Sequence, residues 1–435
     1  IDKIGTYPWP RGLLAHGLEA LAELGADYVV FDIEYLEKSP MTVDDSYLRG
    51  GLRTEFDTAF EEIGSNMAEV FQSLANKRIP LADAGVYGGS LVEYIDETRE
   101  YLYSKTNLVA IENDAYLGQA MRLFGNAYTT LNIQKTRPNE SFMSRMELVE
   151  DRFAYAGLSL ERPMPKESAG FLVPIPEISG LSKGAGFTNV DIDSDGVRRR
   201  IKLVDFHDGK PYLQLSLAPL LDRLGKPGLV YGRRELRLIG AKYPDGVRDV
   251  RIPLAMDGTM LIRWPKKTYI DSFDHIAFHD LLTYRDEAGA FADAVRLLRA
   301  NQGWTLGPGY APVDACLAAW DESEAYRETA LDSGSAEDRE AWLASRREYW
   351  LTVGEFVGMD YGDSVPALYD AARDADDPAY AELYDQMRDD FSLLWNRASE
   401  SYARHLRYDE HLRGKLEGAF CIVGWTSTGS TDFGV

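Results

Sequence analysis

Two stretches of the chain place a helical pattern directly before a short apolar run. Apolar residues recur at three- and four-residue spacing over Leu13 to Leu24, which predicts a helix, and Gly25 is a typical residue for its C-terminal end. The run Asp27 to Tyr35 follows, and its nearly continuous apolar stretch is typical of a strand covered on both faces. The same order of helix, glycine and strand recurs over residues 115–133. This repetition predicts an α/β core.

Two longer segments carry mainly the helical pattern. In residues 44–108 the pattern predicts a hairpin of two helices, and the apolar stripe of the first helix is Phe56, Phe60, Ile63, Met67, Phe71 and Leu74. Residues 286–413 are again helical, with a start signal at Ser335. A stripe from Tyr380 to Tyr402 predicts a helix about 40 Å long. We expect both segments to be insertions that pack on each other.

Residues 187–265 change to short strands separated by turns. The dipeptides Asp195-Gly196 and Asp257-Gly258 each separate two β-rich runs, so each predicts a β-hairpin. A helix is expected between them, over Leu213 to Leu224. The predicted fold is therefore α/β, with a single central mixed sheet, flanking helices, and two long, mostly helical insertions that form a second lobe.

Composition and charge limit the classes of partner. The chain has 435 residues, 45% of them hydrophobic, which is enough to bury a large core. Its 70 acidic and 47 basic residues give a net charge of −23, which repels phosphate backbones, so we expect no binding to nucleic acid. Cys316 and Cys421 lie far apart and we expect no disulfide between them, which leaves the redox compartment open. No apolar run is long enough to span a bilayer, and we expect the chain to be a segment of a longer protein.

Four groups of motifs, in one order along the chain, resemble the CHASE2 family. They are Gly5 to Arg11 with Gly25-Ala26 and Val29 to Ile33; Asp114 to Leu117 with Gly125 to Tyr128; Gly186 to Asp191 with Asp193 to Arg199; and Gly414 to Gly424 with Asp432. The resemblance assigns residues 1–43, 109–285 and 414–435 to a CHASE2-like α/β core. Residues 44–108 and 286–413 are then the two helical insertions, which are longer than the connections expected at those places.

The resemblance implies the extracytoplasmic sensor domain of a bacterial receptor, the periplasmic or cell-surface part of an integral cytoplasmic-membrane protein. Transmembrane helices would flank it, and the two ends of the chain would lie close together. The chain itself would not be an enzyme; the intracellular output would be a class III adenylate cyclase that makes cAMP or, next in preference, a protein kinase. Because such outputs work as dimers, we expect a homodimer of the full-length protein, with a small molecule or protein as the signal. The alternatives are a free periplasmic solute-binding protein and a secreted hydrolase.

The candidate ligand site follows from the predicted strands. Open α/β sheets bind ligands outside the carboxyl ends of their strands. This rule nominates Glu34, Tyr35, Asn132, Gln134, Trp425, Thr426 and Asp432.

Two patterns suggest other chemistry, and each has a simpler interpretation. The alternating aspartates of residues 191–195 imitate the start of a calcium loop, but Lys202 stands where the loop requires a closing glutamate, which favours a plain turn. Asp32 and Glu34 share one face of the predicted strand, which is the basis of the hydrolase alternative. No histidine, cysteine or serine pattern accompanies the pair. We expect no catalytic residue, no metal and no cofactor.

Overall fold

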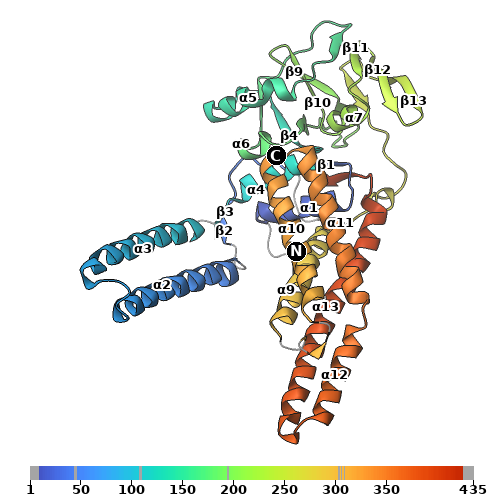
Figure 1. The fold of residues 1–435 in the computed structure, drawn as a ribbon. Helices are drawn as coiled ribbons and strands as arrows, with labels where there is room; N and C mark the ends of the chain where they lie inside the picture. Colours follow the sequence, from blue (N-terminus) through green and yellow to red (C-terminus); the bar gives the residue numbers. More distant parts are fainter. Residues whose placement is uncertain are drawn as a thin grey trace. The chain divides into compact units, whose positions relative to one another are not determined.

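The computed structural model describes residues 9–43, 47–106, 110–193, 195–301, 304, 306–307 and 309–424 (Figure 1). The chain divides into two compact units. One contains residues 13–38 and the chain from residue 117 onward, and the other contains residues 39–116 with the short piece 10–12. The predicted closeness of the two chain ends concerns residues outside the described ranges.

The main sheet is mixed and has five strands. Its order is β15-β1-β4-β6, and β7 also pairs with β4. The bounds are β1 Tyr28–Phe31, β4 Ala127–Gln134, β6 Gly170–Leu172, β7 Gly184–Phe187 and β15 Phe420–Val423. All pairs are parallel except β4 with β6, so β15, β1, β4 and β7 point the same way. All four residues of β1 are buried, as the continuous apolar run predicts.

The helix, glycine and strand units of the sequence are both present. Helix α1, Arg11–Glu23, leads through Gly25 into β1, and helix α4, Asn113–Phe124, leads through Gly125 into β4. Both glycines have positive φ, +80° and +86°, a conformation that residues with a Cβ rarely adopt. Three further helices lie in the chain between β4 and residue 228: α5 Glu140–Phe153, α6 Pro176–Ser179 and α7 Leu217–Arg223.

A second sheet makes the predicted single sheet only an approximation. Its order is β13-β12-β11-β5, with bounds Gly246–Pro253, Glu235–Tyr243, Gly228–Tyr231 and Leu158–Leu160. Its inner face buries a separate apolar cluster that includes Leu221, Leu229 and Leu236. The main sheet packs around another cluster, which includes Leu131 and Phe171. The α/β class is correct. The strands, however, form separate sheets with separate cores and do not join in one layer.

The two predicted Asp-Gly hairpins do not form, although Gly196 and Gly258 both adopt positive φ. The strands that follow the two turns, β8 Arg200–Lys202 and β14 Thr259–Leu261, pair with each other. The strands before them already have partners, since β7 pairs with β4, and β13 pairs with β12. The pairing of β7 and β13 with these other strands therefore overrides the local signal of the two Asp-Gly turns. The remaining strands, β9 Val204–His207 and β10 Lys210–Leu213, form a small antiparallel pair.

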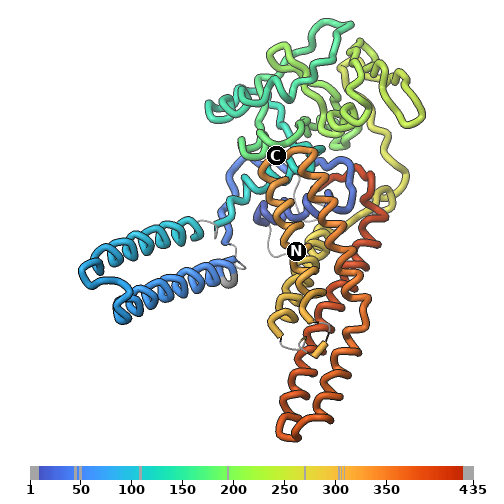
Figure 2. Tube along the Cα trace, viewed as in Figure 1, coloured from blue at the N-terminus to red at the C-terminus, as the bar shows by residue number. Residues whose placement is uncertain are grey.

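The second helical segment is a bundle made of the five helices α9 to α13 (Figure 2). Its bounds are α9 Phe278–Ala300, α10 Ala311–Ser333, α11 Ala336–Gly358, α12 Tyr361–Ala375 and α13 Ala381–Leu416. A largely aromatic core, which includes Phe291, Tyr349 and Phe391, holds the bundle together. The predicted N-cap is present, because the Ser335 hydroxyl accepts the Asp338 backbone N–H at 3.0 Å. The 36 residues of α13 make it longer than predicted, about 54 Å at 1.5 Å per residue.

The first helical segment is the predicted hairpin. Helix α2, Leu52–Ala75, and helix α3, Ala84–Thr106, run antiparallel, and the short strands β2 Thr42–Val43 and β3 Ala110–Ile111 pair at the base. The hairpin and the bundle belong to different compact units. That the two insertions pack on each other in one lobe stays a prediction. Each segment has its own internal contacts. Short helical turns complete the described chain: Tyr47–Gly51, Leu81–Asp83, Tyr269–Ser272 and Pro378–Tyr380.

Candidate functional site

The parallel strands of the main sheet bring several predicted residues to one edge. Strand β1 ends at Phe31, β4 at Gln134 and β7 at Phe187. Because these strands are parallel, the segments that follow them lie at the same edge, where open α/β sheets bind ligands.

Asn132 is the centre of a polar cluster at this edge. Its amide Nδ2 donates to Glu34 Oε1 at 2.7 Å, and its Oδ1 accepts from Gln134 Nε2 at 2.8 Å and from Asn189 Nδ2 at 3.3 Å. Three of the nominated side chains, those of Glu34, Asn132 and Gln134, are therefore in contact with one another. Glu34 is exposed and Asn132 is half-buried, so solutes can reach the cluster.

Asn189 belongs to this cluster, and the sequence reasoning missed it. Its Oδ1 accepts the backbone N–H of Ile133 at 2.7 Å, and its Nδ2 donates to the carbonyl of the same residue at 3.1 Å. The side chain thus replaces a strand partner beside β4. Asn189 follows the end of β7 by two residues, so the same rule applied to that strand would have found it.

Tyr35 is a nominated residue that the structure removes from the ligand surface. Its side chain is 3% exposed and lies edge-on against Phe31, with ring centroids 6.1 Å apart. Its carbonyl accepts the Ile175 backbone N–H at 2.9 Å, and the next carbonyl, that of Leu36, accepts from Arg145 at 2.7 Å. Tyr35 therefore anchors the loop that presents Glu34 and does not itself face solvent.

The paired-carboxylate interpretation rested on a strand that ends earlier. Asp32 and Glu34 follow β1 in a loop, so the alternation of a strand does not place them on a common face. Asp32 instead continues the contact with the last strand, since its backbone N–H donates to Val423 at 2.9 Å. Trp425, Thr426 and Asp432, the other nominated residues, lie outside the described residues.

The opposite edge of the sheet is closed by charged contacts. Lys183 Nζ lies 2.6 Å from Asp222 Oδ2, and the hydroxyl of Tyr28 donates to the same oxygen at 2.9 Å. Burial alone would raise the pKa of Asp222, but the hydrogen bonds from Lys183 and Tyr28 outweigh it and lower that pKa. Burial, with the hydrogen bond to Asp222, raises the pKa of Tyr28. The amino edge is thus internally paired, whereas the carboxyl edge presents amides and the exposed carboxylate of Glu34.

Two of the aspartates that imitate a calcium loop form ion pairs with arginines. Arg199 lies 2.7 Å from Asp195 and 3.4 Å from Asp193, and Arg200 lies 3.6 Å from Asp193. The Arg199 hydrogen bond, with that of the Val197 backbone, lowers the pKa of Asp195 to about 2. Within the described ranges, no group of three or more His, Cys, Asp or Glu residues is placed to hold a metal ion.

A buried ionic network joins α1 of the core to the helical bundle, and no sequence pattern indicated it. Glu19, which is 1% exposed, lies 3.1 Å from Arg285 on α9 and 3.5 Å from Arg327 on α10. One turn further along α1, Glu23 lies 3.4 Å from Arg346 on α11. Burial raises the pKa of Glu23 in spite of the neighbouring arginine. Helix α1, which makes these contacts, leads directly into β1, and the loop after β1 carries Glu34.

Arg346 is a buried member of this network that contacts two carboxylates. It is 6% exposed and lies 2.5 Å from Glu324 of α10, in addition to its contact with Glu23. Its guanidinium also lies 5.0 Å from the centre of the Trp320 ring. This arginine therefore binds one carboxylate of the core and one of the bundle.

Residues 1–298 match the CHASE2 domain in a comparison with protein families. The match includes the first helical segment and ends within α9. Searches of curated proteins and of solved structures found no match. Among the described helices, none is long and apolar enough to cross a membrane. Because the match spans more than half of the chain, the protein belongs to the CHASE2 family, an extracytoplasmic family of sensor domains found in signalling receptors.

Proposed function

We propose that this chain is the extracytoplasmic sensing domain of a bacterial transmembrane receptor and that membrane helices flank it in the full-length protein. The observation that carries the proposal is the family match over residues 1–298. The output is intracellular and lies outside this chain, which is itself not an enzyme.

The ligand site of the proposed sensor is the cluster of Glu34, Asn132, Gln134 and Asn189. Its amides offer donors and acceptors in fixed positions, because Asn189 is held to the backbone of β4 and Asn132 is held by its neighbours. Its one carboxylate favours a neutral or cationic polar ligand over an anion, in keeping with the net charge of −23. A small polar molecule or a polar segment of a protein fits this chemistry.

The proposed signal passes from this edge through β1 to α1 and on to the bundle. Glu34 follows β1, α1 precedes it, and Glu19 and Glu23 of α1 bind arginines of α9, α10 and α11. The last bundle helix, α13, leads into β15, which pairs with β1 along its whole length. Sheet and bundle are thus linked twice, by ion pairs and by strand pairing.

For the output we favour a class III adenylate cyclase, with a protein kinase as the next choice. The test is to measure cAMP formation from ATP, and phosphate transfer from ATP to protein, in membranes that contain the full-length protein. A rate that changes when residues 1–435 are removed supports the regulatory role. A reading frame with a signal peptide and a stop codon directly after residue 435 would instead identify a free periplasmic protein and refute the receptor.

A further inference from the structure

The α2–α3 hairpin exposes far more apolar surface than it buries. The buried side chains of its two helices are Ala59, Thr98 and Leu102. By contrast, Phe60 and Phe71 are each 62% exposed. The helices leave a cavity of about 300 Å³ between them, lined by residues such as Val70 and Leu91. Helical stability in proteins comes mostly from packing of an apolar face, and this hairpin supplies little of it internally.

The apolar stripe of α2 lies on one side of the hairpin. The residues of α2 that face α3 include Glu55, which binds Tyr101, and Glu62, which binds Tyr94. At about 100° per residue, the stripe of α2 is turned by roughly a third of a turn from these contacts. This stripe consists of Phe56, Phe60, Ile63, Met67, Phe71 and Leu74.

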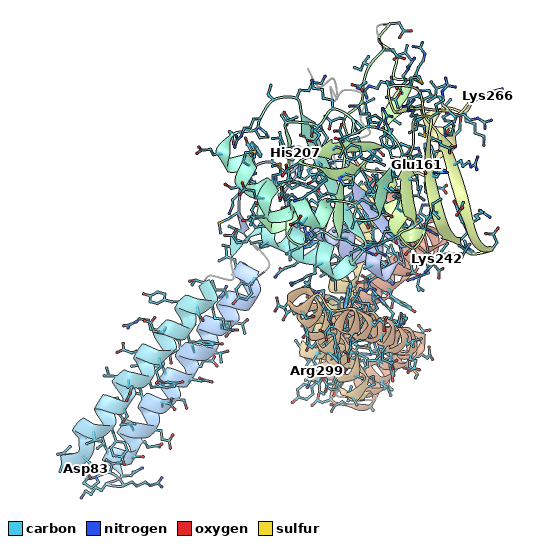
Figure 3. All side chains as sticks on the ribbon, turned by 90° about the horizontal axis from the view of Figure 1, so that it is seen from above. Asp83, Glu161, His207, Lys242, Lys266 and Arg299 are labelled. Atoms are coloured by element: carbon cyan, nitrogen blue, oxygen red, sulfur yellow. The ribbon has the colours of Figure 1, made fainter. Side chains whose placement is uncertain are left out.

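Helix α3 adds to the same side. Two of its exposed apolar residues, Val92 and Ile95, are also turned away from the residues that contact α2. Because the two helices run in opposite directions, these turns bring both stripes to a common side, which we call the apolar face. Side chains project from both helices, and Asp83 marks the tip of the hairpin (Figure 3).

The acidic side chains of the hairpin are segregated from the apolar face, whereas Arg99 lies on it beside Val92 and Ile95. Residues 52–106 contain ten acidic and five basic side chains. By the same helical geometry, the exposed acidic residues of α3 occupy the other side: Glu93, Asp96, Glu97 and Glu100. An acidic excess opposes docking on anionic lipid, because amphipathic helices that bind such membranes carry a basic polar face. Two apolar faces, however, can meet without bringing the acidic sides together.

We propose that the apolar face binds the same face of a second copy of this chain, so that two hairpins form a four-helix bundle. The 4-3 spacing of Phe56, Phe60, Ile63 and Met67 is that of helices that pack against other helices. With 24 and 23 residues, the two helices are about 36 Å long and together about 20 Å wide, which gives a face of about 700 Å². Specific interfaces bury about 600–1,000 Å² on each partner, so the area of this face lies within the range of a specific dimer. A self-complementary patch is also what a twofold dimer requires.

Sedimentation velocity of the 435-residue chain over a range of concentrations tests the proposal. We expect a monomer–dimer equilibrium that the double variant Phe60→Glu, Phe71→Glu weakens by about 100-fold or more, because each dimer loses four phenylalanine contacts. The control carries the same charges on the polar side, Thr58→Glu with Gln72→Glu, and keeps the dimer. Circular dichroism checks that both variants fold, which the exposure of the four residues leads us to expect.

A second measurement covers a dimer that forms only when the chain is confined to a surface. The chain is attached through a C-terminal His-tag to vesicles that contain a nickel-chelating lipid. The attached Met67→Cys variant is then treated with a short bismaleimide, which cross-links two nearby thiols. The control is Ser65→Cys, whose thiol lies on the polar side. The dimer predicts cross-linking at position 67 and little at position 65. Absence of dimer in both measurements, equal dimerisation of the Phe60→Glu, Phe71→Glu variant, or equal cross-linking at both positions overturns the proposal. Binding of the untagged chain to vesicles that is lost in this variant would show that lipid covers the face instead.

Discussion

The variant Arg346→Met tests whether the buried ionic network holds the core and the bundle together. Arg346 lies 3.4 Å from Glu23 and 2.5 Å from Glu324, and the side chains of Arg346 and Glu23 are only 7% and 9% exposed. Removing one member of a buried ion pair leaves its partner charged without compensation, at a cost of about 3–5 kcal/mol. Methionine retains most of the apolar stem, so this cost is chiefly electrostatic.

The loss depends on pH in a defined direction. Without Arg346, the pKa values of Glu23 and Glu324 rise in the folded state, because the arginine lowers both. The folded variant then binds protons at pH values where the unfolded chain does not, so its stability rises as the pH falls. The difference between the wild type and the variant should therefore be largest near pH 8 and shrink toward pH 5.

Urea unfolding followed by circular dichroism measures this difference at both pH values. The matched control is Arg296→Met, since the side chain of Arg296 is 48% exposed and its partner Asp293 is 67% exposed. An exposed pair of this kind contributes about 1 kcal/mol or less. A loss below about 1 kcal/mol in Arg346→Met, or an equal loss at pH 5 and pH 8, would refute the reasoning.

Two further predictions concern the bundle. Burial lowers the pKa of His405, which is 3% exposed, to about 4, so the unfolded chain takes up a proton first as the pH falls below about 6.5. Between pH 6.5 and about pH 4, this group should lower the free energy of unfolding by about 3 kcal/mol. In His405→Gln, the free energy of unfolding measured with urea should therefore depend less on pH over this range. An unchanged pH dependence would count against a buried neutral imidazole. Phe391→Ala removes a fully buried ring that stacks on Trp395 at 6.1 Å, and should cost about 3–5 kcal/mol by the same assay, whereas Leu393→Ala, at 70% exposed, should cost less than about 1 kcal/mol; equal losses would contradict the assigned core.

Local patterns predicted the elements whose stability is local. The hairpin of α2 and α3, the N-cap at Ser335 and the glycine ends of α1 and α4 all follow from neighbouring residues. The Asp-Gly turns form for the same reason, but the pairing of β8 with β14 depends on strands far apart in the chain. Long-range pairing of this kind has no local signature, which is why the predicted hairpins were wrong and the predicted single sheet is only loosely matched.

The candidate site was predicted in part for a related reason. The rule for carboxyl ends of strands found Glu34, Asn132 and Gln134, which are in contact. It also selected Tyr35, because the sequence does not show that β1 ends at Phe31 and that the chain then turns the ring inward. The network of Glu19, Glu23 and the bundle arginines connects residues more than 250 positions apart, and only the folded arrangement brings them together.

The side of the membrane on which this chain lies tests the central claim most directly. Gln72 is exposed on the hairpin, so the full-length protein carrying Gln72→Cys can be treated with a membrane-impermeant maleimide in intact spheroplasts. Cys316 is buried, and burial raises the pKa of Cys421 to about 11, so neither native thiol should react quickly. An extracytoplasmic sensor predicts labelling at position 72 without lysis, whereas labelling that requires lysis would contradict the account.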